Sequence, residues 1–228
     1  MRKKTLIVLD FDGTLAPIVS DPENARIKFN DLKNLWKLSK KAEVEILTGR
    51  PTSFVKKQMA GLKIRILGLH GNKANATSPG IVNLKKRAIW LFGTTRDVVE
   101  EKPLSFTLHY RNAPKLKQNI ARFAKTAGKS ITVLEGRKAF EFLPASMKVK
   151  SETLEAIVTR NSNRRVLFIG DDYSDLEGIL RMQKYSNFTG VLVKSREVQS
   201  KGTKTISRSK LFSFIENFVN GNSNEKKA

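Results

Sequence analysis

The chain has 228 residues, of which 39% are hydrophobic and 28% are charged, as in an ordinary soluble globular protein. No apolar run approaches about 18 residues, so the sequence predicts no membrane-spanning helix and no membrane partner. The absence of cysteine excludes disulfides, thiolate metal sites and a thiol nucleophile, and it suits a cytoplasmic protein.

The formal net charge of +22 is the unusual bulk property of the chain. A basic surface attracts anionic substrates such as phosphate esters, and it can also bind nucleic acid through its phosphates. The basic residues are scattered, and no segment combines a basic stripe with interleaved aromatic residues. We therefore expect no specific nucleic-acid partner, and a general solubility trait is the simplest explanation of the charge. The oligomeric state stays open, with a monomer favoured.

Strand-length apolar runs alternate with helical patterns, which is typical of a parallel sheet with crossover helices. The first part of the chain predicts strands at 6–9, 44–47 and 64–69, with helices at 30–41 and 53–59. The last part predicts strands at 165–169 and 191–193 and a closing helix at 211–219. The first strand is wholly apolar, as expected of a strand that is buried on both faces.

The middle of the chain has a different pattern. It predicts a strand at 104–110, a helix at 114–127, and two strands at 131–134 and 138–143 around a glycine turn at 135–137. The predicted fold class is therefore α/β, with a Rossmann-like parallel-sheet core and an inserted α+β cap domain. We expect the core at 1–79 and 146–228 and the cap at 80–145.

Two aspartates follow the first predicted strand directly, in the segment Asp10-Phe11-Asp12-Gly13-Thr14. Ligands of open α/β sheets lie beyond the carboxyl ends of the strands, so both carboxylates are expected to reach a site there. One carboxylate can attack phosphorus while the other transfers protons to the leaving group and from water. The alternative is a simple polar turn, because Asp and Gly are common turn residues.

A second acidic segment follows the strand at 165–169 and reads Gly170-Asp171-Asp172-Tyr173-Ser174-Asp175. Acidic clusters at the ends of neighbouring strands would form an oxygen-rich pocket that suits Mg²⁺. The alternative for any one of these aspartates is a helix N-cap.

Between the acidic segments, Thr48, Gly49 and Arg50 follow the strand at 44–47. A hydroxyl and backbone N–H groups at such a turn can hold a phosphoryl oxygen. Lys148 or Lys150 could supply a cation to the phosphate and to the nucleophile.

These residues, in this order, resemble the four motifs of the haloacid dehalogenase superfamily. Within it, the sequence resembles the trehalose-6-phosphate phosphatase family. That resemblance rests on five local matches: residues 10–19, Thr48-Gly49-Arg50, Leu69-His70-Gly71, Glu100-x-Lys102 before His109-Tyr110-Arg111, and Gly136 with Glu141 before Pro144.

The resemblance implies a sugar-phosphate phosphatase of trehalose biosynthesis with Mg²⁺ as cofactor and an aspartyl-phosphate on Asp10. It implies that Asp12 is the general acid/base and that Thr48 and Lys148 hold the phosphoryl group. The implied metal ligands are Asp10, Asp12 through its backbone carbonyl, Asp171, Asp172 and Asp175. The implied substrate-binding residues are Gly49, Arg50, Glu100, Lys102, His109, Arg111, Arg137 and Glu141.

Three positions depart from the family pattern. Lys148 is followed by Val149 where relatives have glycine, Leu143 replaces an arginine, and Leu176 replaces an acidic residue. Lys150 therefore remains open as the motif lysine, and the choice of Asp172 or Asp175 at the metal is also open. The alternative functions are hydrolysis of another sugar phosphate or a glycosyl-glycerate phosphate, a non-catalytic sugar-phosphate-binding regulatory protein, and a nucleic-acid-associated protein.

Overall fold

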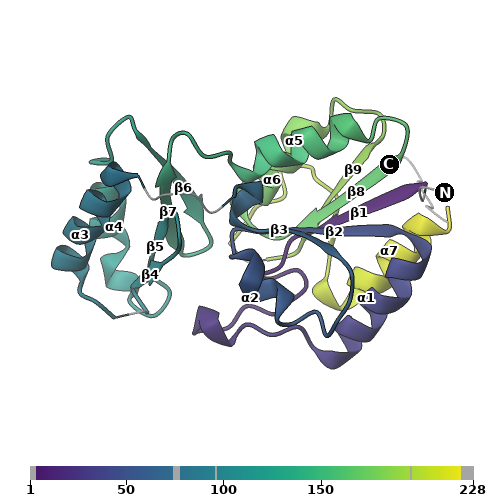
Figure 1. Cartoon of the computed structure of the whole chain (residues 1–228), viewed down its shortest axis with the longest axis horizontal. Coiled ribbons are helices and arrows are strands. Elements are labelled where there is room, and N and C mark those ends of the chain that lie inside the picture. Colours follow the sequence, from purple (N-terminus) through teal and green to yellow (C-terminus); the bar gives the residue numbers. More distant parts are fainter. Residues whose placement is uncertain (1–3, 74–77, 96, 196, 222–228) are drawn as a thin grey trace.

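The computed structural model describes residues 4–73, 78–95, 97–195 and 197–221, which form two sheets with their own helices (Figure 1). The larger sheet, here called the core sheet, has six strands in the order β10-β9-β8-β1-β2-β3, and all its pairings are parallel. Its strands are β1 (Thr5–Leu9), β2 (Glu43–Leu47), β3 (Arg65–Leu67), β8 (Arg165–Gly170), β9 (Phe188–Val193) and β10 (Thr205–Ile206). The structure confirms the predicted α/β fold class with a parallel-sheet core.

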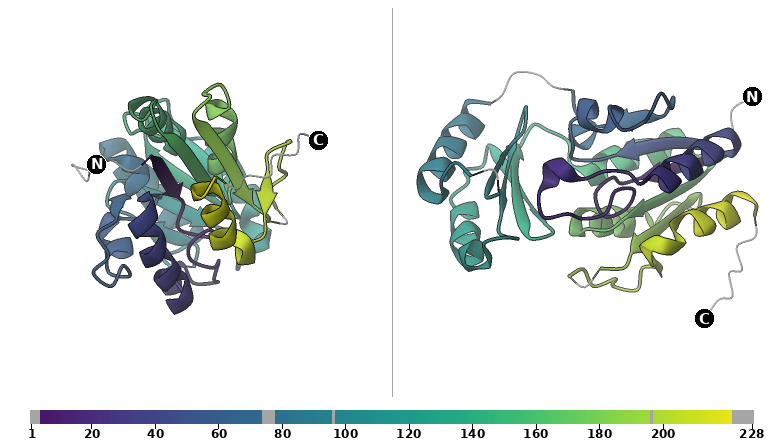
Figure 2. Two further views of the ribbon diagram at one scale, coloured as in Figure 1. Left: turned by 90° about the vertical axis from the view of Figure 1, so that its right-hand side faces the viewer. Right: turned by 90° about the horizontal axis from the view of Figure 1, so that it is seen from below.

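The central strand β1 is buried on both faces. Ile7 and Leu9 pack against α1 (Phe29–Lys41) and α7 (Leu211–Val219). Leu6 and Val8 face the opposite side, against α5 (Lys150–Arg160) and α6 (Tyr173–Met182). Figure 2 shows these helix pairs on the two sides of the sheet. A strand between two helical layers needs apolar residues on both faces, which explains its uninterrupted apolar sequence.

The register of the core sheet brings three strand ends together. Leu9 is level with Ile46 of β2 and with Ile169 of β8. Because the strands run parallel, the residues that follow all three emerge at the same edge. The fold therefore gathers the two acidic segments and the Thr48 turn at one place.

The smaller sheet, here called the cap sheet, is antiparallel with the order β4-β5-β7-β6. Its strands are β4 (Val99–Glu101), β5 (Phe106–His109), β6 (Ile131–Gly136) and β7 (Ala139–Pro144), and its helices are α3 (Pro79–Phe92) and α4 (Lys117–Ala124). In Figure 1 both helices lie on the side of the cap sheet that faces away from the core. Since α3 begins at Pro79 and β7 ends at Pro144, we keep 80–145 as the proposed cap boundaries.

Alternation along the cap strands separates an apolar face from a polar one. Phe106 and Phe142 stack with ring centroids 4.7 Å apart and belong to the apolar cluster beneath the cap helices. Thr107, His109 and Glu141 alternate with apolar residues and line a pocket on the opposite face. The cap sheet thus presents polar groups to the core.

Several predicted elements differ in extent from those observed. The helix expected at 114–127 starts as a 3₁₀ turn (Pro114–Leu116), continues as α4 and ends at Ala124, and α2 spans only Thr52–Lys56. The hairpin turn is not centred on Gly136, because Gly136 pairs with Ala139 and the turn falls at 137–138. The remaining 3₁₀ turns are Pro22–Asn24, Leu69–Gly71 and Arg208–Lys210. No helix in the described part of the chain has the length and apolarity needed to cross a bilayer.

Candidate active site

Three buried carboxylates form a cluster at the edge where β1 and β8 end. One oxygen from each of Asp10, Asp171 and Asp175 lies within 4.8 Å of the others. Asp10 and Asp171 follow their strands directly, and Asp175 lies in the first turn of α6. The side chains expose 6%, 4% and 0% of their surface.

Lys150 is the cation of this cluster. Its Nζ donates to Oδ1 of Asp10 at 2.7 Å and to Oδ1 of Asp175 at 2.8 Å. Lys150 is the first residue of α5, so its side chain is fixed by the start of the helix. The structure therefore identifies Lys150 as the lysine beside the predicted nucleophile.

The assignment of Lys148 to this position is wrong. Lys148 is exposed, and its backbone N–H and C=O are hydrogen bonded to the side chain of Asn72 at 2.9 and 2.8 Å. One residue separates the two lysines, and only the later one enters the helix and turns towards the core sheet. The sequence left both open because it did not determine where α5 begins.

Burial dominates the electrostatics of the cluster. Burial raises the pKa of Asp10 well above its ordinary value, against the opposing effect of Lys150. Burial also raises the pKa of Asp171, and it raises the pKa of Asp175 to about 6. The positive charge of Lys150 is thus too small to offset three buried carboxylates, a condition that favours binding of a further cation.

Gly13 allows the two acidic segments to approach each other. Its φ is +79°, and a Cβ atom at this position would lie 1.9 Å from Oδ2 of Asp171. Any side chain here would both strain the backbone and collide with the Asp171 carboxylate.

Asp172 is a helix cap. Its Oδ1 accepts from the backbone N–H of Asp175 at 2.9 Å and from the Ser174 hydroxyl at 2.8 Å. In return, Asp175 Oδ2 accepts from the N–H of Asp172 at 3.2 Å and from that of Asp171 at 2.9 Å. This reciprocal capping box starts α6, so Asp172 fits the N-cap alternative and its carboxylate lies outside the three-carboxylate cluster.

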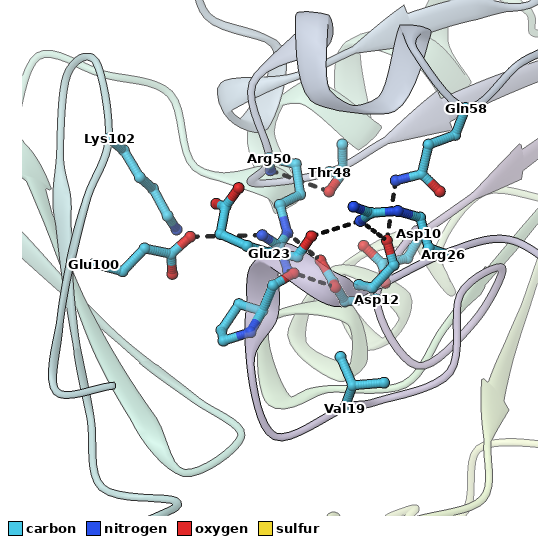
Figure 3. A network of polar contacts seen from close by, with 12 residues as sticks. Asp10, Asp12, Val19, Glu23, Arg26, Thr48, Arg50, Gln58, Glu100 and Lys102 are labelled. Carbon is cyan, nitrogen blue, oxygen red and sulfur yellow. Dashed lines mark hydrogen bonds and ion pairs between the residues drawn. The ribbon is translucent and has the colours of Figure 1, made fainter. Parts of the chain in front are cut away.

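The side chain of Asp12 also lies outside the cluster, because Arg50 holds it, and a metal contact through the Asp12 backbone carbonyl stays a prediction. Arg50 donates to both oxygens of Asp12, from Nε at 2.8 Å and from Nη2 at 2.9 Å (Figure 3). The guanidinium stacks over the Phe54 ring and approaches Glu100 of the cap at 3.6 Å. Arg50, expected at the substrate, is here a link between Asp12 and the cap.

Thr48 is almost fully buried beside the ion pair of Asp12 and Arg50. Its hydroxyl accepts from the backbone N–H of Arg50 at 3.1 Å, and it lines the same pocket as Asp10. Gly49 next to it passes close to the cap, since a Cβ there would lie 3.0 Å from the His70 ring and 3.6 Å from Glu141.

Two carboxylates of the cap form hydrogen-bonded networks above the core. Glu141 accepts from Lys102 and from Ser105, and it contacts Nε2 of His70, each at 3.0 Å. Burial opposes ionisation of Glu141, but Lys102 and then His70 overcome it and lower the pKa of Glu141.

Glu100 forms the second network. It contacts Nε2 of His109 at 2.8 Å. Burial would raise the pKa of Glu100, but Lys102 and His109 lower it to about 2. Both cap carboxylates are therefore ionised acceptors that face the core.

Sequence reasoning missed His70 and Ser105. His70 lies within the Leu69-His70-Gly71 match, which implies no role for this side chain. Its backbone adopts φ of 57°, which is uncommon for a residue other than glycine, and its Nε2 reaches across to Glu141 of the cap. No pattern of hydrophobicity marks such a contact, because it joins residues 71 positions apart.

Arg111 and Arg137 of the cap contact core groups. Arg111 donates to the backbone carbonyl of Val19. Arg137 lies 3.1 Å from Asp171 Oδ2 and 2.8 Å from Glu197. Their expected part in sugar binding remains a proposal.

One pocket between core and cap collects most of the expected site residues. Lys148 and Asp175 are absent from its lining, whereas the following residues line it: Asp10, Asp12, Thr48, Gly49, Arg50, Glu100, Lys102, His109, Arg111, Arg137, Glu141, Lys150, Asp171 and Asp172. Leu143 and Leu176, which depart from the family pattern, are buried and do not line it.

A parallel-sheet core with acidic strand ends and a lysine on the following helix, covered by an inserted cap, defines the haloacid dehalogenase class of folds. Solved structures agree with this class. The chain resembles the C-terminal domain of the C. albicans trehalose-6-phosphate phosphatase with a TM-score of 0.78 and 19% identity, covering 96% of this chain and 93% of that one. It also resembles a trehalose-6-phosphate phosphatase related protein with a TM-score of 0.66 and 18% identity, covering 97% and 100% of the two chains.

Sequence comparison indicates a family within this class of folds. The trehalose-phosphatase family model matches residues 8–85. The trehalose-phosphate phosphatase of Mycolicibacterium paratuberculosis is 30% identical over 195 residues, which cover 74% of this chain and 49% of that protein. A trehalose-phosphate synthase of Dictyostelium discoideum is 29% identical over 210 residues, 82% of this chain and 26% of that protein. The chain thus spans half or less of these relatives' length. The chain has a fold of the haloacid dehalogenase class, and its sequence resembles the trehalose-6-phosphate phosphatase family.

Proposed function

We propose that the protein is a Mg²⁺-dependent phosphatase that converts a sugar phosphate, most specifically trehalose 6-phosphate, into the free sugar and inorganic phosphate. The observation that carries this proposal is the position of Lys150 between Asp10 and Asp175, beneath a pocket that Glu100 and Glu141 cover. A buried lysine bonded to a carboxylate at a strand end is suited to hold a phosphoryl group against that carboxylate.

In the first step, a carboxylate oxygen of Asp10 attacks phosphorus. The bond between phosphorus and the sugar oxygen breaks, and the departing oxygen takes a proton from the carboxyl group of Asp12. Lys150 and the Thr48 hydroxyl stabilise the charge on the transferring group. The product on the protein is an aspartyl-phosphate.

In the second step, a water molecule gives a proton to the carboxylate of Asp12, and its oxygen attacks phosphorus. The bond to Asp10 breaks, which releases inorganic phosphate and restores both aspartates. In the structure both oxygens of Asp12 accept hydrogen bonds from Arg50, which fixes the orientation of this side chain.

The donor set of the site fits a divalent cation. Three buried carboxylates with pKa values raised by burial offer only hard oxygen ligands, which suit Mg²⁺ better than zinc or copper. Asp10, Asp171 and Asp175 would hold the ion, and a bound ion would neutralise charge on the phosphoryl oxygens.

Recognition of the sugar is proposed for the cap. Ionised Glu100 and Glu141 can accept hydrogen bonds from hydroxyls, and Lys102 and Arg111 can donate to sugar oxygens. The disaccharide is inferred from the similarity to trehalose-phosphate phosphatases. We further propose a monomeric, cytoplasmic enzyme of trehalose biosynthesis.

Release of phosphate from a panel of sugar phosphates tests the proposal. With Mg²⁺ present, trehalose 6-phosphate should give the highest kcat/KM, and Asp10→Asn should abolish turnover. A different preferred sugar phosphate would change the substrate but keep the mechanism. No turnover of any phosphate ester would contradict the enzyme and favour a regulatory role.

A further inference from the structure

Arg137 lies on the turn of the β6–β7 hairpin, between two carboxylates of the core. Its Nη1 is 3.1 Å from Oδ2 of Asp171, and its Nη2 is 2.8 Å from Oε2 of Glu197. The Arg137 side chain is 22% exposed and the Asp171 side chain only 4%. A residue of the cap thus contacts a buried carboxylate of the core.

Asp171 belongs to the three-carboxylate cluster that is proposed to hold a cation. Asp171 cannot move far, because it packs against the backbone at Gly13 and emerges directly from β8. A cation bound to all three carboxylates would therefore have to share Asp171 with Arg137.

We propose that Arg137 and the divalent cation compete for Asp171, so that entry of the metal releases this cap arginine from the core. The inference rests on the proposed function, since it concerns the same metal site. In the released state, the guanidinium is free to interact with the anionic substrate above the nucleophile.

Charge is the physical reason for competition. Lys150 and Arg137 already offset two of the three clustered carboxylate charges. Holding a guanidinium and a divalent cation on one buried carboxylate places like charges close together where little water screens them. The guanidinium and the cation must therefore each weaken the binding of the other to Asp171, and this coupling is reciprocal.

Glu197 gives Arg137 an alternative partner. It lies in the loop after β9, with its side chain 31% exposed, and its Oε2 already forms an ion pair with the second guanidinium nitrogen at 2.8 Å. Leaving Asp171 therefore does not leave Arg137 without a counter-ion. The arginine stays in the pocket lining, where its guanidinium can contact the anionic substrate.

The experiment measures Mg²⁺ binding to the full chain by isothermal titration calorimetry, after chelator treatment and without substrate. Arg137→Met should bind Mg²⁺ about tenfold more tightly than wild type, within the roughly 5–150-fold range of couplings between sites. The matched control is Lys138→Met, which removes the same charge from the next residue. Lys138 reaches Glu197 only at 3.7 Å, so its loss should change the affinity less than about twofold.

Three results of the titration would overturn the competition between Arg137 and the cation. Equal affinities of wild type and Arg137→Met would overturn the inference while leaving the metal site intact. Equal gains in both variants would also overturn it, because a general charge effect would then explain the change. No binding in any of the three proteins would overturn both the inference and the proposed metal dependence.

A second measurement follows the reciprocal effect. If Mg²⁺ displaces Arg137, saturating Mg²⁺ should raise amide hydrogen exchange at the β6–β7 turn in the wild type and leave it unchanged in Arg137→Met. Increased protection of the turn on Mg²⁺ binding in the wild type would overturn the inference, as would no change in its exchange.

Discussion

Replacing Lys150 by methionine should disable the site more than any other removal of a basic residue. Lys150 donates to Asp10 at 2.7 Å and to Asp175 at 2.8 Å, with only 5% of its side chain exposed. Methionine keeps an unbranched side chain in the same space but removes the charge. The change leaves buried carboxylates without their closest cation.

The expected loss of stability follows from this burial. Breaking a buried ion pair by removing one partner costs roughly 3–5 kcal/mol in the free energy of unfolding. Part of this cost is relieved because burial already favours the neutral form of Asp10 and Asp175, so a carboxyl can take up a proton. We therefore expect a loss of roughly 2–4 kcal/mol at about pH 7 in the absence of metal.

The sign of the pH dependence is determined by the same groups. A buried carboxyl whose pKa is raised on folding contributes stability at low pH, and that contribution is lost as the pH rises through the folded-state pKa. For Asp175 this value is about 6 with Lys150 present, and removal of the lysine raises it further. The stability difference between Lys150→Met and wild type should therefore shrink as the pH falls from the raised pKa of the variant towards about 6.

Urea unfolding in EDTA measures the stability, and phosphate release with Mg²⁺ measures the activity. Loss of a charge-stabilising donor typically lowers kcat by about 10²–10³-fold. The matched control is Lys148→Met, which removes an exposed lysine two residues away and should change both quantities little. The proposed role of Lys150 is refuted if Lys150→Met keeps more than about a tenth of wild-type kcat while Lys148→Met loses its phosphatase activity.

Other perturbations test separate parts of the site. Glu141→Ala should lower kcat/KM for trehalose 6-phosphate about tenfold or more but hardly affect p-nitrophenyl phosphate, and equal losses on both esters would indicate a structural role instead. Excess EDTA should silence turnover and Mg²⁺ should restore it, so full activity in EDTA would exclude the metal site. Gly13→Ala should weaken Mg²⁺ binding at least about tenfold, because its Cβ would lie 1.9 Å from Asp171, and unchanged affinity in calorimetry would contradict this geometry. The shift of the Glu100 pKa from its ordinary 4.5 to about 2 corresponds to roughly 3 kcal/mol. The stability advantage of wild type over Glu100→Gln in urea unfolding should therefore be full above about pH 4.5 and disappear as the pH falls towards about 2, and a pH-independent difference would refute the ionic account.

The strand-end motifs were predictable because they depend on one-dimensional patterns. The apolar run of β1 identifies a strand buried on both faces, and parallel strands necessarily end at one edge. Asp10 and Asp171 could thus be brought together from sequence alone. The helices α3, α5 and α6 were not predicted, and the start of α5 is what distinguishes Lys150 from Lys148.

Contacts between core and cap could not be predicted in the same way. The pairs of His70 with Glu141 and of Arg137 with Asp171 depend on how a cap strand and a hairpin turn are placed over the core sheet. Both the basic and the acidic members look like ordinary surface charges in the sequence. Family resemblance located most of these residues, but it assigned Arg50 and Arg137 to the substrate and did not reveal their carboxylate partners in this structure.

The aspartyl-phosphate on Asp10 can be tested directly by rapid quenching of the Mg²⁺-loaded enzyme during turnover of trehalose 6-phosphate, followed by peptide mass spectrometry. We expect one added phosphoryl group on the peptide that carries Asp10. We expect no phosphorylated peptide in Asp10→Asn. Continued turnover by the wild type with no phosphorylated peptide, or with the phosphoryl group on a peptide that lacks Asp10, would contradict the account.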